Sequence, residues 1–204
     1  MGSKTKLRRS TLFSAIISFI SFLYKAGLGI YAMSLVLIIA SLSTLMVFIC
    51  KIIVVKNITA KRDAKKKAYL GITIAAFIYS LIFVLFAILK VNNIDISPNN
   101  NYQGWIEVLF IAFLLLMFVL SVINLKGALE KTDIMVVGLK EITFLSALTD
   151  LIIIEEYVSR IILKYYEVPN MTQINSYFVL GVGGVLLLVP LIMLIRFFRY
   201  KPNN

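Results

Sequence analysis

Six long apolar runs, separated by short polar or basic segments, constrain the fold of this chain more than any other feature. About 20 apolar residues of helix cross the hydrocarbon core of a bilayer, and in lipid the backbone must satisfy its own hydrogen bonds. The runs cover residues 11–26, 30–55, 69–90, 105–125, 142–163 and 176–198. We therefore predict an all-α, polytopic transmembrane helix bundle of about six spanning helices, which forms a single integral membrane domain over residues 1–204.

Composition and residue types exclude most other classes of protein. Hydrophobic residues make up 60% of the chain, charged residues make up 15%, and the mean hydropathy is +0.94, whereas a soluble domain carries roughly 25% charged residues. Histidine is absent and Cys50 is the only cysteine, which excludes disulfide frameworks, zinc fingers and the Ser-His-Asp triad. The sequence also lacks a nucleotide-binding loop. We therefore predict no metal site and no cofactor.

The basic residues fall in blocks between the apolar runs, and these blocks predict the orientation in the membrane. Cytoplasmic loops keep an excess of lysine and arginine. With both termini cytoplasmic, all of the 21 basic residues except Lys25, Lys90, Arg160 and Lys164 lie on the inner side. The loop 91–104 has no lysine or arginine and falls outside. Because the net charge of +11 lies in these blocks, we expect no nucleic-acid partner.

The first run, 11–26, is the shortest and carries several serines. If it spans the membrane, the chain turns back at Gly27, Leu28 and Gly29. If it lies on the inner surface instead, the lysine-rich segment from Lys56 to Lys67 is forced outside, so the charge distribution favours a spanning helix. With that orientation we expect Lys56 to Lys67 to lie against anionic lipid head groups.

Small and polar residues predict where the helices pack. In lipid, helices associate through small residues that let backbones approach and through polar groups that bond between helices. Positions that share a helix face at spacings of three or four are Ser14, Ser18, Ser21, Gly71, Ala75, Ala76 and Ser80, and Gly181 and Gly184 lie near the outer end of the last run. The run 105–125 is bulky on all sides and is the best candidate for the lipid-facing periphery.

The fifth run carries the most informative polar residues. At 100° per residue a stripe of about 120° holds Ser146, Thr149, Asp150, Glu156 and Arg160, whereas Glu155 lies off it. Ionisable groups at membrane depth cost roughly 2.5–3.5 kcal/mol each, so they normally face the bundle interior and find partners. We expect Asp150 near the bilayer centre, either protonated or bonded to a serine of another helix. We expect Glu156 to pair with Arg160, four residues later on the same helix.

Three interpretations of this stripe remain open: a structural ion pair, a polar pathway or ligand site, and a catalytic site that uses Glu155, Glu156 and Arg160. The register is open as well. A span over residues 134–154 would bury Lys140 and Glu141 and expose everything from Glu155 onward. In the first register, Asp133 caps a short amphipathic segment on the inner surface, residues 133–140, before the fifth helix begins.

Two resemblances to known families follow from short stretches of sequence. Glu155-Glu156-x-x-x-Arg160 resembles the first motif of the CAAX protease and bacteriocin-processing family, which implies a glutamate that activates water with the help of later histidines. This chain has no histidine, so we interpret the match as coincidental. The six-run order and the stretch from Lys140 to Leu148 resemble an uncharacterised family of small membrane proteins of Gram-positive bacteria, which implies no activity.

Our first functional interpretation is a non-enzymatic, multi-pass protein of the plasma membrane of a Gram-positive bacterium. It would act as a transporter-like protein, or as a subunit or immunity partner in a membrane complex, with a membrane protein or a second copy as partner. The alternatives are an atypical intramembrane hydrolase that uses Glu155 and Glu156, and a structural or assembly factor whose charges meet a partner protein.

Overall fold

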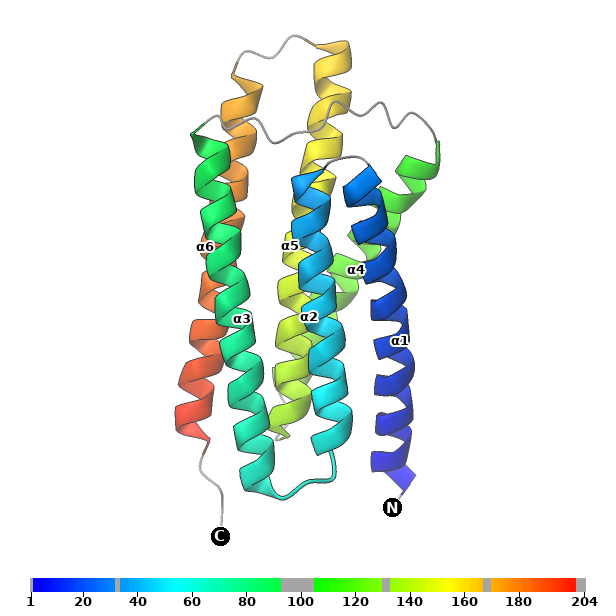
Figure 1. Cartoon of the computed structure of the whole chain (residues 1–204), viewed down its shortest axis with the longest axis vertical. Helices are drawn as coiled ribbons and strands as arrows, with labels where there is room; N and C mark the ends of the chain where they lie inside the picture. The colour runs from blue at the N-terminus through cyan, green and yellow to red at the C-terminus, as the bar shows by residue number, and fades with distance from the viewer. Residues whose placement is uncertain (1, 32–33, 93–104, 130–132, 167–169, 201–204) are drawn as a thin grey trace.

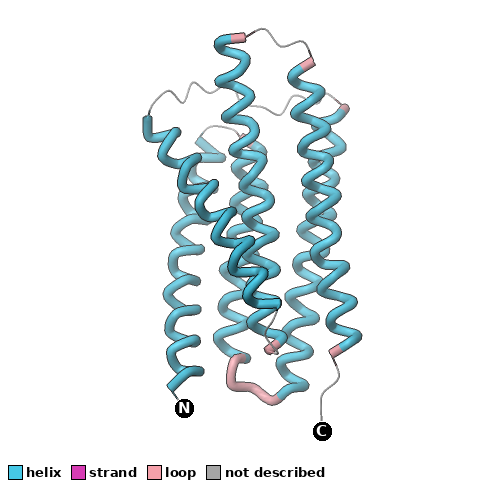
Figure 2. Tube along the Cα trace, turned by 180° about the vertical axis from the view of Figure 1, so that it is seen from behind, coloured by secondary structure: helices cyan, strands magenta, loops and turns pink. Residues whose placement is uncertain are grey.

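The computed structural model describes residues 2–31, 34–92, 105–129, 133–166 and 170–200, and these residues form an all-helical bundle (Figure 1). No strand occurs among them, as Figure 2 shows. The helices are α1 (Gly2–Tyr31), α2 (Leu35–Asn57), α3 (Arg62–Val91), α4 (Trp105–Leu129), α5 (Ile134–Tyr165) and α6 (Met171–Arg199). The prediction of an all-α helical membrane bundle with six helices is therefore confirmed.

Five of the described helices are long and apolar enough to cross a membrane, and α5 is not among them. It carries more charged residues than the others, yet it is the central helix, packing against α2, α3, α4 and α6. With 32 residues and a rise of 1.5 Å per residue, α5 is about 48 Å long and exceeds the bilayer core of about 30 Å. The helix with the most charged residues thus lies at the centre, among four other helices.

The helices run up and down, so α1 begins and α6 ends at the same end of the bundle (Figure 1). We call this the proximal end and the opposite one the distal end. The short connection between α2 and α3 also lies at the proximal end. At the distal end, the last part of α5 and the first part of α6 rise beyond the hairpin of α1 and α2.

The hairpin of α1 and α2 differs from the predicted turn. Gly27, Leu28 and Gly29 are helical, because α1 continues to Tyr31 and packs along α2. Ser34 caps α2 with its side chain, which accepts a hydrogen bond from the Leu37 amide at 3.3 Å. At Gly29 a Cβ atom would lie 3.0 Å from the Ile38 backbone nitrogen. The glycine therefore serves close approach of the two helices rather than the turn itself.

The start of α5 also corrects an expectation. Asp133 does cap a helix, since its carboxylate accepts from the Met135 amide at 3.0 Å, but the helix it caps is α5 itself. The predicted surface segment forms the first two turns of this helix, and Ile134 and Met135 are 2% and 0% exposed. The segment is interior because α5 enters the bundle at its first residue. Both registers considered for this helix are parts of one long helix.

The small residues divide into those at helix contacts and those on the outer surface. Ala76 and Ser80 of α3 are fully buried, and the Ser80 hydroxyl donates to the Leu186 carbonyl of α6 at 2.9 Å. Gly71, Gly181 and Gly184 are exposed, with nothing within 4 Å of an added Cβ, so they are not packing contacts within this chain; Ala75 is half-buried. In α6 the close approach is at Gly183, where a Cβ would lie 3.3 Å from the Val84 side chain.

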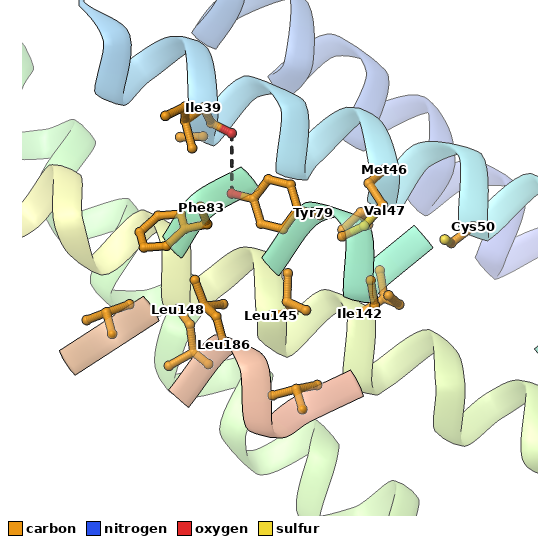
Figure 3. Close-up of a cluster of buried hydrophobic side chains, with 14 of the residues drawn as sticks. Ile39, Met46, Val47, Cys50, Tyr79, Phe83, Ile142, Leu145, Leu148 and Leu186 are labelled. Atoms are coloured by element: carbon orange, nitrogen blue, oxygen red, sulfur yellow. Dashed lines mark hydrogen bonds between the residues drawn. The ribbon is translucent and has the colours of Figure 1, made fainter. Parts of the chain in front are cut away.

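An apolar core fills the space between α2, α3, α5 and α6 (Figure 3). Its fully buried members include Ile72, Phe83, Leu145 and Leu186. Among them the Tyr79 hydroxyl donates to the Ile39 carbonyl at 3.3 Å, the contact drawn in Figure 3. The helices α1 and α4 are peripheral, because within the described residues the backbone of α1 packs against α2 alone and that of α4 against α5 alone. The lipid-facing position predicted for the fourth run agrees with this arrangement.

Candidate functional site

Polar side chains of α5 contact other helices at three levels along the bundle. Glu141 lies toward the proximal end, Asp150 in the middle, and Glu155 and Glu156 toward the distal end. Every one of these carboxylates comes from α5. The surrounding helices supply lysine, arginine or tyrosine partners to three of them, whereas Glu155 bonds to a serine of α5 itself. Because an unpaired charge in lipid is costly, the partner of each carboxylate decides what that level can do.

At the middle level Asp150 forms an ion pair with Lys25 of α1. The Lys25 Nζ atom lies 2.6 Å from Asp150 Oδ1 and 3.2 Å from Thr44 Oγ1 of α2. The side chains of Lys25 and Asp150 are 3% and 11% exposed. Asp150 lies in the interior, as its place on the polar stripe predicts, but its partner is a lysine instead of the expected serine or proton. The sequence feature that could have identified Lys25 as a buried partner is its position as a single charge near the end of an otherwise apolar run.

Two neutral contacts surround this pair. Ser146 lies 3.1 Å from Ser43 of α2, oxygen to oxygen, and the Thr149 hydroxyl lies 3.0 Å from the Tyr79 hydroxyl of α3. Ser146 and Thr149, predicted on the same stripe as Asp150, therefore face the interior together with it. The middle level joins α5 to α1, α2 and α3 through side chains that are almost completely buried.

At the proximal level Glu141 bonds to two further helices. Its Oε2 atom accepts from the Tyr69 hydroxyl of α3 at 2.9 Å, and its Oε1 atom pairs with Arg196 of α6. Glu141 is 3% exposed, whereas the Arg196 side chain is 29% exposed. The second register predicted Glu141 and Lys140 as buried charges. Lys140 is only half-buried, and its Nζ lies 3.4 Å from Asn124 Oδ1 of α4.

Gly138 lets Tyr69 reach Glu141, which gives a prediction for stability. A Cβ at Gly138 would lie 2.7 Å from two ring carbons of Tyr69, and the ring is held by its bond to Glu141. We expect Gly138→Ala to lower the free energy of unfolding by about 1–3 kcal/mol through overpacking. Gly181→Ala is the matched control, because nothing lies within 4 Å of its Cβ. Denaturant unfolding of the two variants in mixed micelles measures this, and equal stabilities would contradict it.

At the distal level Glu156 pairs with Lys90 of α3 instead of Arg160. Lys90 Nζ lies 2.7 Å from Glu156 Oε1, and both side chains are largely buried. The Arg160 Nε atom donates to the backbone oxygen of Glu156 at 3.3 Å. The predicted ion pair within α5 is therefore corrected. The end of α3 lies against this part of α5, and a lysine from it provides a better shielded partner than the exposed Arg160.

Glu155 and Glu156 have different partners, and the serine that bonds Glu155 belongs to α5 itself. The Ser159 hydroxyl lies 2.9 Å from Glu155 Oε1 and 3.0 Å from Asn175 Oδ1 of α6, while the second carboxylate oxygen of Glu155 is buried without a hydrogen-bond partner. The hydrolase considered from the sequence would use both carboxylates. In the described contacts Glu156 pairs with Lys90 of α3, whereas Glu155 bonds within α5 to Ser159, which in turn contacts Asn175 of α6.

A further buried charge was not predicted at all. Lys51 of α2 is 7% exposed, and its Nζ atom contacts the Ser14 and Ser18 hydroxyls of α1 at 2.8 and 2.7 Å. Its place close to the lysine-rich segment had predicted a cytoplasmic position instead. Ser14, Ser18 and Ser21 are predicted to form one packing face, and Ser14 and Ser18 do contact α2 through Lys51.

No protein-family model, curated protein or solved structure matches this chain. The contacts described above form ion pairs at three depths of a membrane bundle. The carboxylate of each pair comes from the central helix α5, and the cations come from α1, α3 and α6.

Proposed function

We propose that this chain is a non-enzymatic, multi-pass protein of a Gram-positive bacterial plasma membrane that carries a small cation across the bilayer. The observation that carries the proposal is the Lys25–Asp150 pair. Asp150 lies at the middle of α5, which runs from Ile134 to Tyr165. A carboxylate at this depth needs a positive partner, and here the partner is a lysine on a different helix.

The position of Lys25 allows that partner to be exchanged. The described backbone of its helix, α1, packs against α2 alone, and the Lys25 side chain is the described hydrogen-bonded link from α1 to the central helix. A cation that binds Asp150 in place of Lys25 releases this link without disturbing the packing of α2, α3, α5 and α6. Two arrangements of α1 with little difference in packing are what a transporter-like cycle requires.

The orientation we propose places the proximal end in the cytoplasm. Exposed basic side chains gather there at Lys56, Lys61 and Lys67, whereas Lys65 pairs with Asp133 at 2.6 Å. Exposed bases at the surface interact with anionic head groups at about 1 kcal/mol each. Lipid is thus the partner proposed for Lys56 to Lys67.

Flux measurements in reconstituted vesicles test the proposal. Dyes that report protons, sodium and potassium would be enclosed in vesicles with purified protein, under a gradient of each ion in turn. We expect one of these cations to pass with the wild-type protein and not with Asp150→Asn, which keeps the side-chain shape but removes the charge. Asp63→Asn, at the exposed start of α3, is the matched control and should keep the flux.

A second candidate function is that of a structural or assembly factor. It is favoured by the three ion pairs that join α5 to α1, α3 and α6. If the pairs only hold the helices together, Asp150→Asn and wild type will show the same ion flux as protein-free vesicles and will differ in stability alone. That outcome would overturn transport. We prefer transport because α1, whose described backbone packs against α2 alone, needs no charge at the bilayer centre in order to pack.

A further inference from the structure

Lys51 is a second buried lysine on the contact between α1 and α2, and it is held differently from Lys25. Lys25 extends from α1 to Thr44 of α2, whereas Lys51 extends from α2 to Ser14 and Ser18 of α1. Thr44 and Lys51 are two turns apart on α2, or about 10 Å. The two lysines thus bridge the same helices at two levels, with Lys51 on the proximal side.

The charges around Lys51 do not stabilise an ammonium ion. Its three described contacts are the Ser14 carbonyl at 3.0 Å and the Ser14 and Ser18 hydroxyls. Of the helices packed against α2, α1 supplies these neutral groups, and α5 supplies Lys140, which repels it. No carboxylate from α3 or α5 contacts Lys51 among the described residues. A buried ammonium without a counterion is costly, so the neutral amine competes with it here.

The serine hydroxyls can satisfy both protonation states of Lys51 by rotation of one hydroxyl hydrogen, with the heavy atoms in place. An ammonium group has three hydrogens, which fit its three oxygen contacts. A neutral amine has two hydrogens and a lone pair. The Ser18 hydroxyl already donates to the Ser14 carbonyl at 3.1 Å, so the Ser14 hydroxyl can turn its hydrogen toward the lone pair. Hydroxyl groups both donate and accept hydrogen bonds, whereas an ionised carboxylate such as that of Asp150 only accepts them.

We propose that Lys51, Ser14 and Ser18 form a proton-exchange site on the proximal side of Asp150, so that the cation carried by this protein is the proton. This inference rests on the proposed function. When the ammonium of Lys51 gives up a proton and the carboxylate of Asp150 takes it, both groups become neutral and Lys25 loses its counterion. Ser21, which is half-buried, follows Ser18 on the same face of α1 and lies between the two levels.

The protonation state of Lys51 can be measured directly and without a transport assay. In protein labelled with nitrogen-15 at lysine Nζ and embedded in lipid nanodiscs, an amine and an ammonium resonate at different shifts. We expect one buried lysine signal to move to the amine position between neutral and mildly alkaline pH, and to be absent in Lys51→Arg. Lys56→Arg, an exposed lysine of the same helix, should leave it unchanged. If every buried lysine stays an ammonium over this range, the proposal is overturned.

Proton flux with the same variants separates this inference from the proposed function. Arginine stays protonated, so Lys51→Arg keeps donors for the serines but cannot release a proton. We expect it to lose proton flux, whereas Lys56→Arg should keep it. If Lys51→Arg conducts protons while Asp150→Asn does not, the exchange site is wrong and the transport proposal stands. If Asp150→Asn abolishes sodium or potassium flux and protons never pass, the proton is not the carried ion.

Discussion

Replacing either member of the Lys25–Asp150 pair by an apolar residue should destabilise the protein far more than replacing both. Lys25→Met leaves a carboxylate, and Asp150→Leu leaves an ammonium, in surroundings where the two side chains are 11% and 3% exposed. In soluble proteins, breaking a buried pair in this way costs about 3–5 kcal/mol, whereas replacing both charges by apolar groups is often neutral. Neutral hydrogen bonds between membrane helices average only about 0.6 kcal/mol.

We expect each single change to lower the free energy of unfolding by about 3 kcal/mol, because an unpaired buried charge costs more than a lost neutral hydrogen bond. The double change Lys25→Met with Asp150→Leu should lower it by less than either single change. The free energy of unfolding in mixed micelles, combined in a double-mutant cycle, measures the coupling. Lys65→Met is the matched control. Lys65 pairs with Asp133 at the same 2.6 Å, but Asp133 is 35% exposed, so its loss should cost under about 1 kcal/mol. Additive single changes would contradict a buried pair.

The second large effect is expected at Arg196, the more exposed member of its pair. Arg196→Met leaves Glu141, whose side chain is 4% exposed, without its cation, although Tyr69 still donates to it. Glu141→Gln leaves Arg196, whose side chain is 29% exposed and lies close to the proximal end, where its guanidinium can reach water or head groups. Replacing the more exposed Arg196 should therefore destabilise the protein more than replacing the buried Glu141.

We expect Arg196→Met to lower the free energy of unfolding by about 3 kcal/mol, toward the range for a buried charge left unpaired, and Glu141→Gln by about 1 kcal/mol. The combination of both changes should recover much of the stability lost in Arg196→Met alone. Arg196→Lys, which keeps the charge, should be intermediate. The same unfolding measurements decide this, and a larger loss for Glu141→Gln than for Arg196→Met would show that the glutamate is not the costly partner.

Several parts of the site followed from sequence because they depend on one helix. The 100° rotation per residue places Ser146, Thr149 and Asp150 on one face whatever surrounds the helix, and all three are buried in the bundle. The capping role of Asp133 is equally local. The partner predicted for Glu156 was wrong. A spacing of four residues within α5 indicates that Arg160 is near, but it carries no information about Lys90 of α3, which lies closer to the carboxylate.

The sequence by itself determined that this chain forms a helical membrane bundle, because apolar runs of spanning length leave the backbone no other way to satisfy its hydrogen bonds in lipid. It also determined which face of the fifth helix is polar. Only the tertiary structure decided which charges meet. Lys25 and Asp150 are far apart in the chain, as are Glu141 and Arg196, and no periodicity within a helix encodes which neighbour it will pack against. Lys51 shows this most clearly, because its place beside the lysine-rich segment indicated a cytoplasmic position, whereas the packing of α1 on α2 turned its side chain inward to Ser14 and Ser18.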